Sequence, residues 1–314
     1  MTSAIKHALV TGGAGFIGSH LVDALAGQGT RVTVIDNLTT GKRENLQEAG
    51  SGVAFHEGDI RDGVLLKRLI ADVEVVFHQA AVVSVPLSVE QPLSSAAVNE
   101  TGTLEVLEAA RQAGCRRVVL ASSSAVYGDD PELPKRETMA FCPLSPYAVQ
   151  KMTGEYYAGL YTRLYGLETA CLRYFNVFGP RQDPSSPYSG VISIFMERAA
   201  AGRAPVIYGD GDQTRDFIYV QDVVKANLRA ATEDGVAGKA FNIGSGNTIT
   251  IRRLWQQVAE LGGVALTPEY QDTRDGDIRH SVADIAAARR YLGFRPEVPF
   301  EDGLAKTYAW YRRA

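Results

Sequence analysis

The sequence contains few residues of the kinds that build disulfide-rich or metal-binding proteins. It has three cysteines, Cys115, Cys142 and Cys171, and five histidines. The cysteines show no paired spacing, and the histidines are scattered without a His-x-x-x-His or similar pattern. Neither a disulfide framework nor a metal site is therefore expected, and a reducing cytoplasm is the default location.

Long hydrophobic runs and blocks of like charge are also missing. No apolar run reaches the roughly 20 residues that span a bilayer, and the opening MTSAIKHALVTGG indicates a buried strand rather than a secretory segment. The net charge is -4, with no basic block that would suggest nucleic acid. With 45% hydrophobic and 22% charged residues, the 314-residue chain has a globular composition, enough for one large or two smaller domains.

Short apolar runs alternate with amphipathic stretches through the first part of the chain. Apolar runs without clean alternation, separated by helices, predict a parallel sheet covered on both faces. Right-handed crossovers then give an α/β, doubly wound Rossmann sheet. The predicted strands are 7–11, 31–36, 53–57, 75–79, 117–121 and 168–173, and the predicted helices are 17–28, 63–71, 98–112 and 147–165.

The composition and the length of the predicted elements change after about residue 176. Gly, Pro, Ser and Asp cluster in GPRQDPSSPYSG and YGDGDQTRD, and shorter helices are predicted at 191–201, 220–231, 251–259, 285–291 and 300–311. We expect residues 1–175 to form the Rossmann domain, with a return of about 236–246 to its sheet. Residues 176–314 are expected to form a smaller, partly interleaved domain whose loops close over the sheet.

A glycine-rich turn follows the first predicted strand. TGGAGFIGSHL contains Gly12, Gly13, Gly15 and Gly18, and it opens a predicted helix. In that context the glycines let the backbone approach a pyrophosphate, which the free N–H groups of the helix start can bind. The turn therefore predicts a dinucleotide site.

Polar residues at the ends of the next strands predict which dinucleotide binds. Asp36, 18 residues after Gly18, can accept both ribose hydroxyls of NAD and would repel a 2′-phosphate. Lys42 and Arg43 follow and could tolerate NADP, but a charged acceptor at the strand end should outweigh them, so NAD is preferred. Asp59 either reaches the adenine amino group or caps the following helix.

Two further segments are expected close to the cofactor. Small residues after Gln79, at the end of the fourth strand, would let the backbone lie against it. Asn99 is polar inside a mostly apolar stretch, so it either pairs locally or holds neighbouring backbone near the nicotinamide side.

The pair Tyr147 and Lys151 is the strongest candidate for chemistry. The residues are four apart, so both side chains leave one helix face. A phenol with a pKa near 10 is a poor base, but a fixed ammonium favours the phenolate. The pair is thus suited to removing a proton from an alcohol beside a nicotinamide. Three serines, 122–124, follow the fifth strand, where a hydroxyl could bond the substrate oxygen.

At this point the chain resembles a known family. TGGAGFIGSHL, the 36–38 run, GDIRD, SSSAVYGD, SPYAVQK, LRYFNVFGPRQDP, GDGDQTRDFIYVQD and FNIGSG are similar to motifs of the extended short-chain dehydrogenase/reductase family. Within that family, the chain resembles the nucleoside-diphosphate-sugar epimerases of the UDP-glucose 4-epimerase type. The resemblance runs from about residue 7 to the C-terminus.

The resemblance implies roles for individual residues. It makes Tyr147 the base, Lys151 its electrostatic partner and Ser123 the catalytic hydroxyl. The implied cofactor contacts are Gly12, Gly15, Phe16, Ile17, Gly18, Asp36, Asn37, Asp59, Ile60, Gln79, Ala80, Ala81, Asn99, Tyr147, Lys151 and Tyr174. The implied substrate contacts are Ser84, Ser123, Ser124, Asn176, Val191, Tyr208, Arg215, Arg274, Asp277 and Ser281.

The activity implied is inversion at C4 of a UDP-sugar. Tyr147 takes the proton from O4, and C4 gives hydride to tightly bound NAD. The resulting 4-keto sugar swings about its bonds to the diphosphate, and hydride returns to the opposite face. Arg215 and Arg274 suit the diphosphate, since two guanidinium forks match its oxygens.

Three other activities can be compared with this one. A UDP-glucuronate 4-epimerase or decarboxylase needs a cation for the substrate carboxylate, and Arg181 is the nearest candidate. A sugar-nucleotide 4,6-dehydratase carries an Asp-Glu pair after the catalytic hydroxyl, where this chain has Ser124 and Ala125. A non-catalytic NAD-binding regulator would be expected to lose Tyr147 or Lys151.

Substrate size and assembly follow from the same resemblance. The position seven residues after Arg274 limits room around the sugar in this family, and here it is Ser281. A small residue predicts UDP-GlcNAc/UDP-GalNAc as substrates alongside UDP-Glc/UDP-Gal. Related enzymes pair two long helices per subunit, which match 98–112 and 147–165, so a homodimer is expected.

Overall fold

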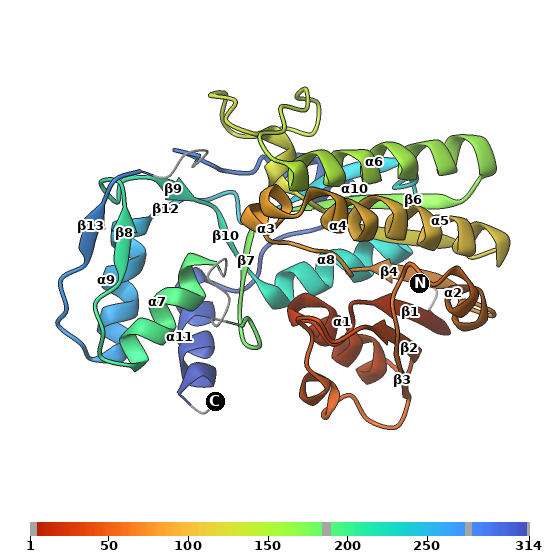
Figure 1. Ribbon diagram of the computed structural model, residues 1–314, viewed down its shortest axis with the longest axis horizontal. Coiled ribbons are helices and arrows are strands. Elements are labelled where there is room, and N and C mark those ends of the chain that lie inside the picture. Colours follow the sequence, from red (N-terminus) through yellow and green to blue (C-terminus); the bar gives the residue numbers. More distant parts are fainter. Residues whose placement is uncertain (1–4, 184–189, 274–277, 313–314) are drawn as a thin grey trace.

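A parallel sheet forms the centre of the molecule (Figure 1), whose computed structural model describes residues 5–183, 190–273 and 278–312. Seven strands lie in the order β11-β6-β5-β4-β1-β2-β3, and every neighbouring pair is parallel. The predicted doubly wound α/β sheet is confirmed. Its strands are β1 (His7–Thr11), β2 (Arg31–Asp36), β3 (Val53–Glu57), β4 (Val75–His78), β5 (Arg117–Ser123), β6 (Glu168–Tyr174) and β11 (Lys239–Ile243).

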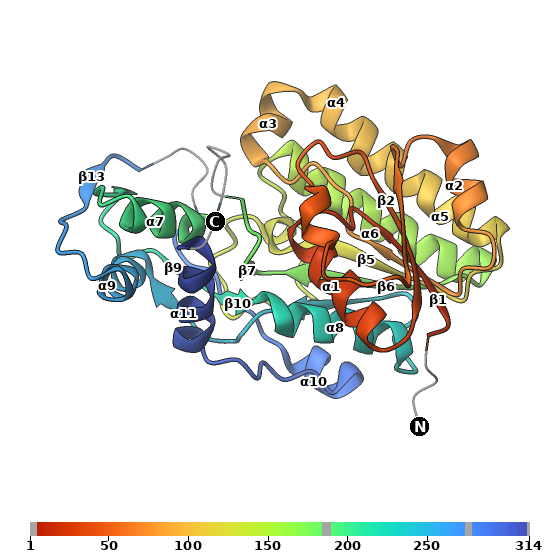
Figure 2. The ribbon, with the colours of Figure 1, turned by 90° about the horizontal axis from the view of Figure 1, so that it is seen from below.

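Helices cover both faces of this sheet (Figure 2). One face packs on α1 (Phe16–Gly27), α8 (Val220–Thr232) and α10 (Ala286–Leu292), with Leu21 and Phe241 among its buried residues. The other face packs on α2 (Gly63–Leu69), α5 (Thr103–Gln112) and α6 (Pro146–Tyr165), with Leu66 and Leu9 in its core. Each such side chain contributes about 1.5–3 kcal/mol by burial, so the two cores hold the sheet edge rigidly.

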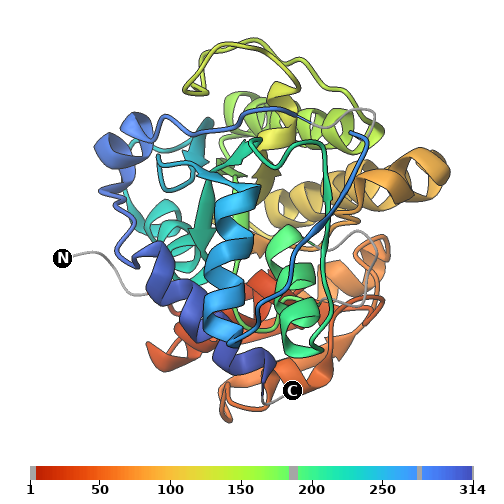
Figure 3. The same cartoon turned by 90° about the vertical axis from the view of Figure 1, so that its left-hand side faces the viewer.

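The C-terminal elements form a separate group beside the sheet (Figure 3). Three helices pack together there: α7 (Val191–Ala200), α9 (Ile251–Gly262) and α11 (Phe300–Tyr311). Phe195 and Trp255 meet edge to face at 5.5 Å in their core. Short strand pairs complete the group: β7 (Asn176–Phe178) with β10 (Phe217–Tyr219), β9 (Thr214–Arg215) with β12 (Ile249–Thr250), and β8 (Val206–Tyr208) with β13 (Glu269–Gln271).

The structure differs from the predicted elements in several places. The helix predicted at 98–112 begins as a π-helical turn, η2 (Ala97–Gly102), before α5. Strand β5 continues to Ser123, so two of the three serines lie in the strand, and the third opens the 3-10 turn η3 (Ser124–Tyr127). The short elements η1 (Arg43–Leu46), α3 (Val85–Glu90) and α4 (Pro92–Ala96) were not predicted, because so few residues show no helical period.

The strand order reverses between β1 and β4. The connections of β1 to β2 and of β4 to β5 run in opposite directions from this point, so a crevice opens at the carboxyl ends of these strands. Ligands of doubly wound sheets bind in that crevice. Among the described residues, no helix has the length and apolar character needed to cross a bilayer.

Candidate active site

The glycine-rich turn between β1 and α1 forms a cradle at this crevice. A Cβ on Gly12 would lie 2.7 Å from Ala80 N, and one on Gly18 would lie 2.1 Å from Gly12 O. The backbone is therefore packed too closely here for side chains. Gly15 is the N-cap of helix α1 and has no side chain to bond the helix start. The first N–H groups, including those of Phe16 and Ile17, are thus left for a ligand. This cradle fits the pyrophosphate of a dinucleotide.

Asp36 lies at the end of β2, beside the cradle. Its Oδ2 accepts from Ala14 N at 3.0 Å and its Oδ1 from Leu38 N at 2.9 Å, which fixes the carboxylate. The two basic residues nearby are engaged elsewhere. Lys42 pairs with Asp183 at 3.3 Å, and the Arg43 guanidinium stacks on the Phe55 ring. The charge at the ribose position is thus negative, which favours NAD over NADP.

Asp59 is held by neighbours on its own loop. Its two oxygens accept from Arg61 Nε at 2.8 Å and Arg61 Nη2 at 2.7 Å, and Asn37 Nδ2 donates to it at 3.2 Å. These bonds, chiefly those from Arg61, lower the pKa of Asp59 to about 2. The alternative role of Asp59 as a helix cap is wrong, because Asp62 caps α2 through two backbone N–H groups. Ile60 is buried against Gly102.

Gln79 and Tyr174 meet in a buried polar cluster at the crevice. The Tyr174 hydroxyl lies 3.2 Å from Gln79 Oε1, and Asn227 Nδ2 donates to that hydroxyl at 2.8 Å. Gln79 Nε2 closes the cluster by donating to Asn227 Oδ1 at 3.1 Å. Asn227, on α8, was not predicted; an amide inside the apolar face of that helix is the signal that could have revealed it.

Asn99, in η2, holds neighbouring backbone in place. Its Oδ1 accepts from Val82 N at 2.8 Å, and its Nδ2 donates to Val82 O at 2.9 Å and to Gln150 Oε1 at 2.7 Å. Asn99 therefore holds neighbouring backbone, and the position of that backbone near the nicotinamide stays a prediction. Ala80 and Ala81 immediately precede the fixed segment, so their backbone is held against the crevice.

A buried series of hydrogen bonds that the sequence analysis did not predict links β1, β4 and α5. Thr11 Oγ1 lies 2.7 Å from His78 Nδ1, His78 Nε2 lies 2.9 Å from Thr103 Oγ1, and Ala80 N donates to Thr11 Oγ1 at 3.2 Å. Since Thr103 Oγ1 donates to Asn99 O, His78 donates through Nε2 and accepts through Nδ1. Burial, together with the Lys151 cation, lowers the pKa of His78 to about 3, so the ring is neutral.

The three residues expected to carry the chemistry come together at the end of β5. Ser123 ends the strand, and Tyr147 and Lys151 project from the first turns of α6, which Ser145 caps. Burial raises the pKa of the Tyr147 phenol, and a hydrogen bond with Ser123 opposes that rise. Lys151 Nζ donates to Ala121 O at 2.8 Å and lies 5.8 Å from the Tyr147 ring centre. Burial lowers the pKa of Lys151 to about 8.

The expected substrate residues come from several elements of the molecule. Ser84 caps α3 by accepting from Leu87 N at 3.1 Å. Ser124 begins η3, and Val191 begins α7. Asn176, on β7, donates through its amide to Asp216 O at 3.1 Å.

The remaining expected substrate residues lie in the C-terminal group. Tyr208 ends β8, and Arg215 ends β9, where its Nη1 donates to Thr214 O at 3.0 Å. Ser281 is buried, and its N–H donates to Thr214 O at 3.3 Å. It therefore lies next to the strand of Arg215. Arg274 and Asp277 lie outside the described residues.

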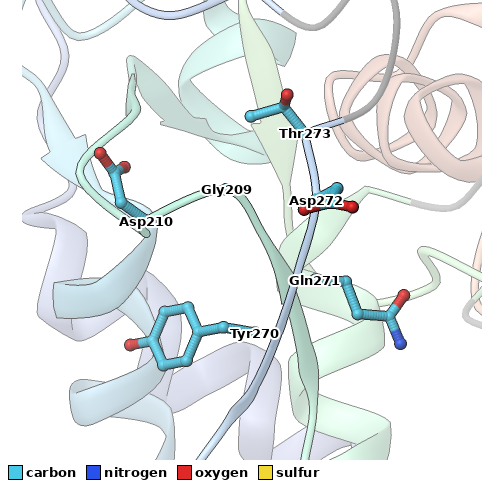
Figure 4. Close-up of a pocket in the computed structure, with 6 residues that line it drawn as sticks. All are labelled: Gly209, Asp210, Tyr270, Gln271, Asp272 and Thr273. Atoms are coloured by element: carbon cyan, nitrogen blue, oxygen red, sulfur yellow. The ribbon is translucent and has the colours of Figure 1, made fainter.

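An open cavity of about 800 Å³ adjoins Tyr208 in the C-terminal group (Figure 4). It lies between the ends of β8 and β13, away from Tyr147 and Lys151. Its lining residues are Gly209, Asp210, Tyr270, Gln271, Asp272 and Thr273. In Figure 4 the Asp210 and Tyr270 side chains both lie on the left of the view, whereas the Gln271 side chain points to the right. This depression is open to solvent, and none of its lining residues belongs to the catalytic group.

The Tyr147 phenol and the glycine cradle serve the same sheet edge, and that combination defines an NAD-dependent enzyme built on a Rossmann sheet. The chain belongs to the NAD dependent epimerase/dehydratase family, whose sequence profile matches residues 8–244. The predicted family and the predicted cofactor, NAD, are confirmed.

Relatives of known name cover nearly the whole chain. It is 44% identical over 309 residues to the UDP-glucose 4-epimerase of Mycolicibacterium smegmatis, covering 97% of this chain and 98% of the relative. The structure of UDP-glucose 4-epimerase with UDP-glucose from Thermotoga maritima has a TM-score of 0.94 at 40% identity, covering 98% and 99% of the two chains. UDP-N-acetylglucosamine 4-epimerase from Methanobrevibacter ruminantium, in complex with UDP-N-acetylmuramic acid, has a TM-score of 0.95 at 42% identity, with the same coverage.

Proposed function

We propose that the protein is a UDP-sugar 4-epimerase, which inverts C4 through a 4-keto intermediate with NAD bound throughout the cycle. The observation that carries this proposal is the meeting of Ser123, Tyr147 and Lys151 beside the dinucleotide cradle. The names of the full-length relatives support it. We further propose that residues 1–175 with 236–246 bind NAD and that residues 176–314 bind the nucleotide sugar.

Each catalytic side chain has one task in this proposal. Tyr147 accepts the O4 proton of the sugar, and Ser123 hydrogen-bonds that oxygen as it becomes a carbonyl. Lys151, whose pKa of about 8 keeps it charged at neutral pH, stabilises the phenolate electrostatically. NAD supplies the acceptor for the C4 hydride when it is bound. Tyr147 is buried and Ser123 and Lys151 are half-buried, and this limited contact with water strengthens their charge interactions.

Inversion also requires a firmly held nucleotide and a loosely held sugar. We propose that Tyr208, Arg215 and the undescribed Arg274 and Asp277 hold the uridine diphosphate. Val191 is proposed to help grip the nucleotide, and Asn176, Ser84 and Ser124 are proposed to contact the substrate nearer the sugar. Arg215 comes from a two-stranded pair tied to the segment of Ser281, so its guanidinium has a rigid support.

The state of Arg181 argues against a glucuronate substrate. Its Nη1 bonds Asp23 Oδ2 of α1 at 2.7 Å, and its Nη2 lies 3.7 Å from Glu48. Its side chain is only 13% exposed. A guanidinium committed to two carboxylates offers little charge to a third, so we favour neutral sugars over UDP-glucuronate. A 4,6-dehydratase is not favoured, because this chain has Ser124 and Ala125 where a dehydratase carries its Asp-Glu pair.

Turnover of pure sugar nucleotides tests the proposal. The protein is incubated with UDP-glucose, UDP-GlcNAc or UDP-glucuronate, and the C4 epimers are separated; the first two are expected to be converted. Tyr147→Phe should lower kcat by at least about a hundredfold, the usual contribution of a general base. Tyr161→Phe is the matched control, since Tyr161 lies on the same helix but bonds Glu108 at 3.1 Å. Full activity of Tyr147→Phe would refute the catalytic assignment.

The size of residue 281 is proposed to set the range of sugars. Ser281 is 8% exposed and packed beside Thr214, so a larger side chain would have to enter the space toward the sugar. Ser281→Tyr should abolish turnover of UDP-GlcNAc before that of UDP-glucose, measured as the ratio of the two kcat/KM values. An equal loss on both sugars would remove this role.

We propose a homodimer that buries the outer face of α6. Val149 and Tyr156 on this helix are 38% and 58% exposed, and Leu93 on the adjacent α4 is 86% exposed. Tyr156→Glu should shift the protein to monomer in analytical ultracentrifugation, whereas Tyr270→Glu, at a 48% exposed site on β13, should not. A cytoplasmic location is proposed because Cys115, Cys142 and Cys171 are free thiols.

A further inference from the structure

The end of β5 is fastened to α6 by three consecutive residues. Ala121 O accepts from Lys151 Nζ at 2.8 Å, Ser122 Oγ donates to Glu155 Oε1 at 2.5 Å, and Ser123 bonds Tyr147. The helix partners are spaced by four residues, so Glu155 continues the face that carries the Tyr–Lys pair by one more turn. Ser122 thus lies between Ala121, which contacts Lys151, and Ser123, which contacts Tyr147.

Glu155 is itself fixed from a second strand. Arg173 on β6 donates through Nε to Glu155 Oε1 at 2.9 Å and through Nη2 to Oε2 at 2.7 Å. The side chains of the pair are 4% and 6% exposed. Arg173 Nη1 also bonds the Tyr127 hydroxyl at 2.8 Å, so the guanidinium has partners on both sides. A buried bidentate pair of this kind holds its geometry tightly.

Among the groups that act on Lys151, Glu155 supplies the negative charge, and its partner Arg173 on β6 brings a positive charge close to it. His78 faces the ammonium from β4 and is neutral, because burial lowers its pKa to about 3. Cys171 faces it from β6 as a neutral thiol, because burial raises its pKa well above the usual value. Tyr147 and Glu155 come from the helix of Lys151 itself. Of these four groups, Glu155 is the one held as a carboxylate, through its bidentate pair with Arg173.

We infer that Glu155 is a positioning residue for the catalytic group, which it serves in two ways. Through Ser122 it fixes the strand end that presents Ser123, and through its charge it sets the pH range in which Lys151 stays protonated. Glu155 touches neither substrate nor cofactor. This inference rests on the proposed roles of Tyr147 and Lys151.

The pH profile of kcat for Glu155→Gln tests this inference. Glutamine keeps an acceptor for Ser122 but removes the negative charge, which favours both the phenolate and the neutral amine. Both limbs of the pH profile, the one set by Tyr147 and the one set by Lys151, should therefore move to lower pH. The expected shift is roughly one pH unit for the loss of one nearby charge. For Lys151, whose pKa is about 8, such a shift lowers the protonated fraction at pH 8 by about fivefold. Isotope-edited NMR of the lysine side chains, in protein stripped of NAD, should show Lys151 titrating earlier.

Two further substitutions separate positioning from general stability. Glu168→Gln breaks a similar pair, Arg117–Glu168 at 2.6 Å, at the opposite end of the same two strands; it should lower stability and leave both limbs in place. Glu155→Asp keeps the charge and should retain the wild-type limbs. If Glu155→Gln does not fold, because Arg173 is left without its carboxylate, Glu155→Gln with Arg173→Gln replaces it. This double variant should show a smaller shift in the same direction, because the Arg173 charge that opposes Glu155 is removed as well.

A profile of Glu155→Gln, or of the double variant, that coincides with that of Glu168→Gln would overturn the inference. Failure of the proposed function has a different signature, since Tyr147→Phe would then keep its turnover whatever the profile at position 155.

Discussion

Gly12 is the position where the nucleotide cradle and the end of β4 come closest. Its φ is +67°, and an added Cβ would lie 2.7 Å from Ala80 N and 2.8 Å from Ala80 Cα. These are backbone atoms, so no side-chain rotation can relieve the contact. Gly12→Ala costs about 1–2 kcal/mol for left-handed backbone and about 1–3 kcal/mol more for overpacking. We expect the free energy of unfolding to fall by about 2–5 kcal/mol.

The same substitution should empty the cofactor site, because relief of the contact moves Ala80 and the cradle apart. Gly29→Ala is the matched control: its φ is +79°, and no atom of the described chain lies within 4 Å of the added Cβ. It should cost only about 1–2 kcal/mol and keep its NAD. Urea unfolding of NAD-stripped protein and the NAD content of freshly purified protein measure the two effects. Gly12→Ala with the stability of Gly29→Ala and a full complement of NAD would refute this reasoning.

Three further outcomes follow from the site. Asp36→Asn should weaken NAD binding about 10- to 100-fold by removing a charged acceptor, without gain of NADP binding because Lys42 is paired; calorimetric titration with both cofactors checks this. The pKa of His78 is lowered to about 3, so its protonation favours the unfolded chain, and stability present above about pH 6.5 declines below it by up to about 1.4 kcal/mol per pH unit. His78→Gln should flatten that slope in urea unfolding, and an unchanged slope would contradict the buried neutral ring. Tyr174→Phe leaves Asn227 short of a partner and should cost about 1–3 kcal/mol in thermal unfolding.

The elements nearest the cofactor were predictable because their signals are local. A strand, a glycine turn and a helix follow one another within 7–28, and the pair at 147 and 151 is a matter of one helical turn. The error at the end of β5 has the same origin. Serine occurs in loops as readily as in strands, so the sequence does not show where β5 ends. Only pairing with β6 extends the strand through Ser123.

The buried polar clusters could not be predicted from neighbouring residues in the sequence. Gln79, Tyr174 and Asn227 meet from three elements spread over the chain, and no spacing rule connects them. The partner of Arg181 is likewise set by how the 180s loop packs on α1. Glu155 could be placed on the Tyr–Lys face by counting, but its bonds to Ser122 and Arg173 depend on which strands lie beneath α6.

The sequence by itself determined the Rossmann class, the dinucleotide turn, the preference for NAD and the spacing of the Tyr–Lys pair. The turn and the Tyr–Lys pair depend on residues close together in the chain, whose geometry the backbone fixes. The Rossmann class and the preference for NAD depend on the order of strands and helices along the chain. The tertiary structure alone decided which buried polar groups share hydrogen bonds and which cations remain available to a substrate. Those choices depend on strand order, which brings residues distant in the chain within hydrogen-bonding distance and removes them from water.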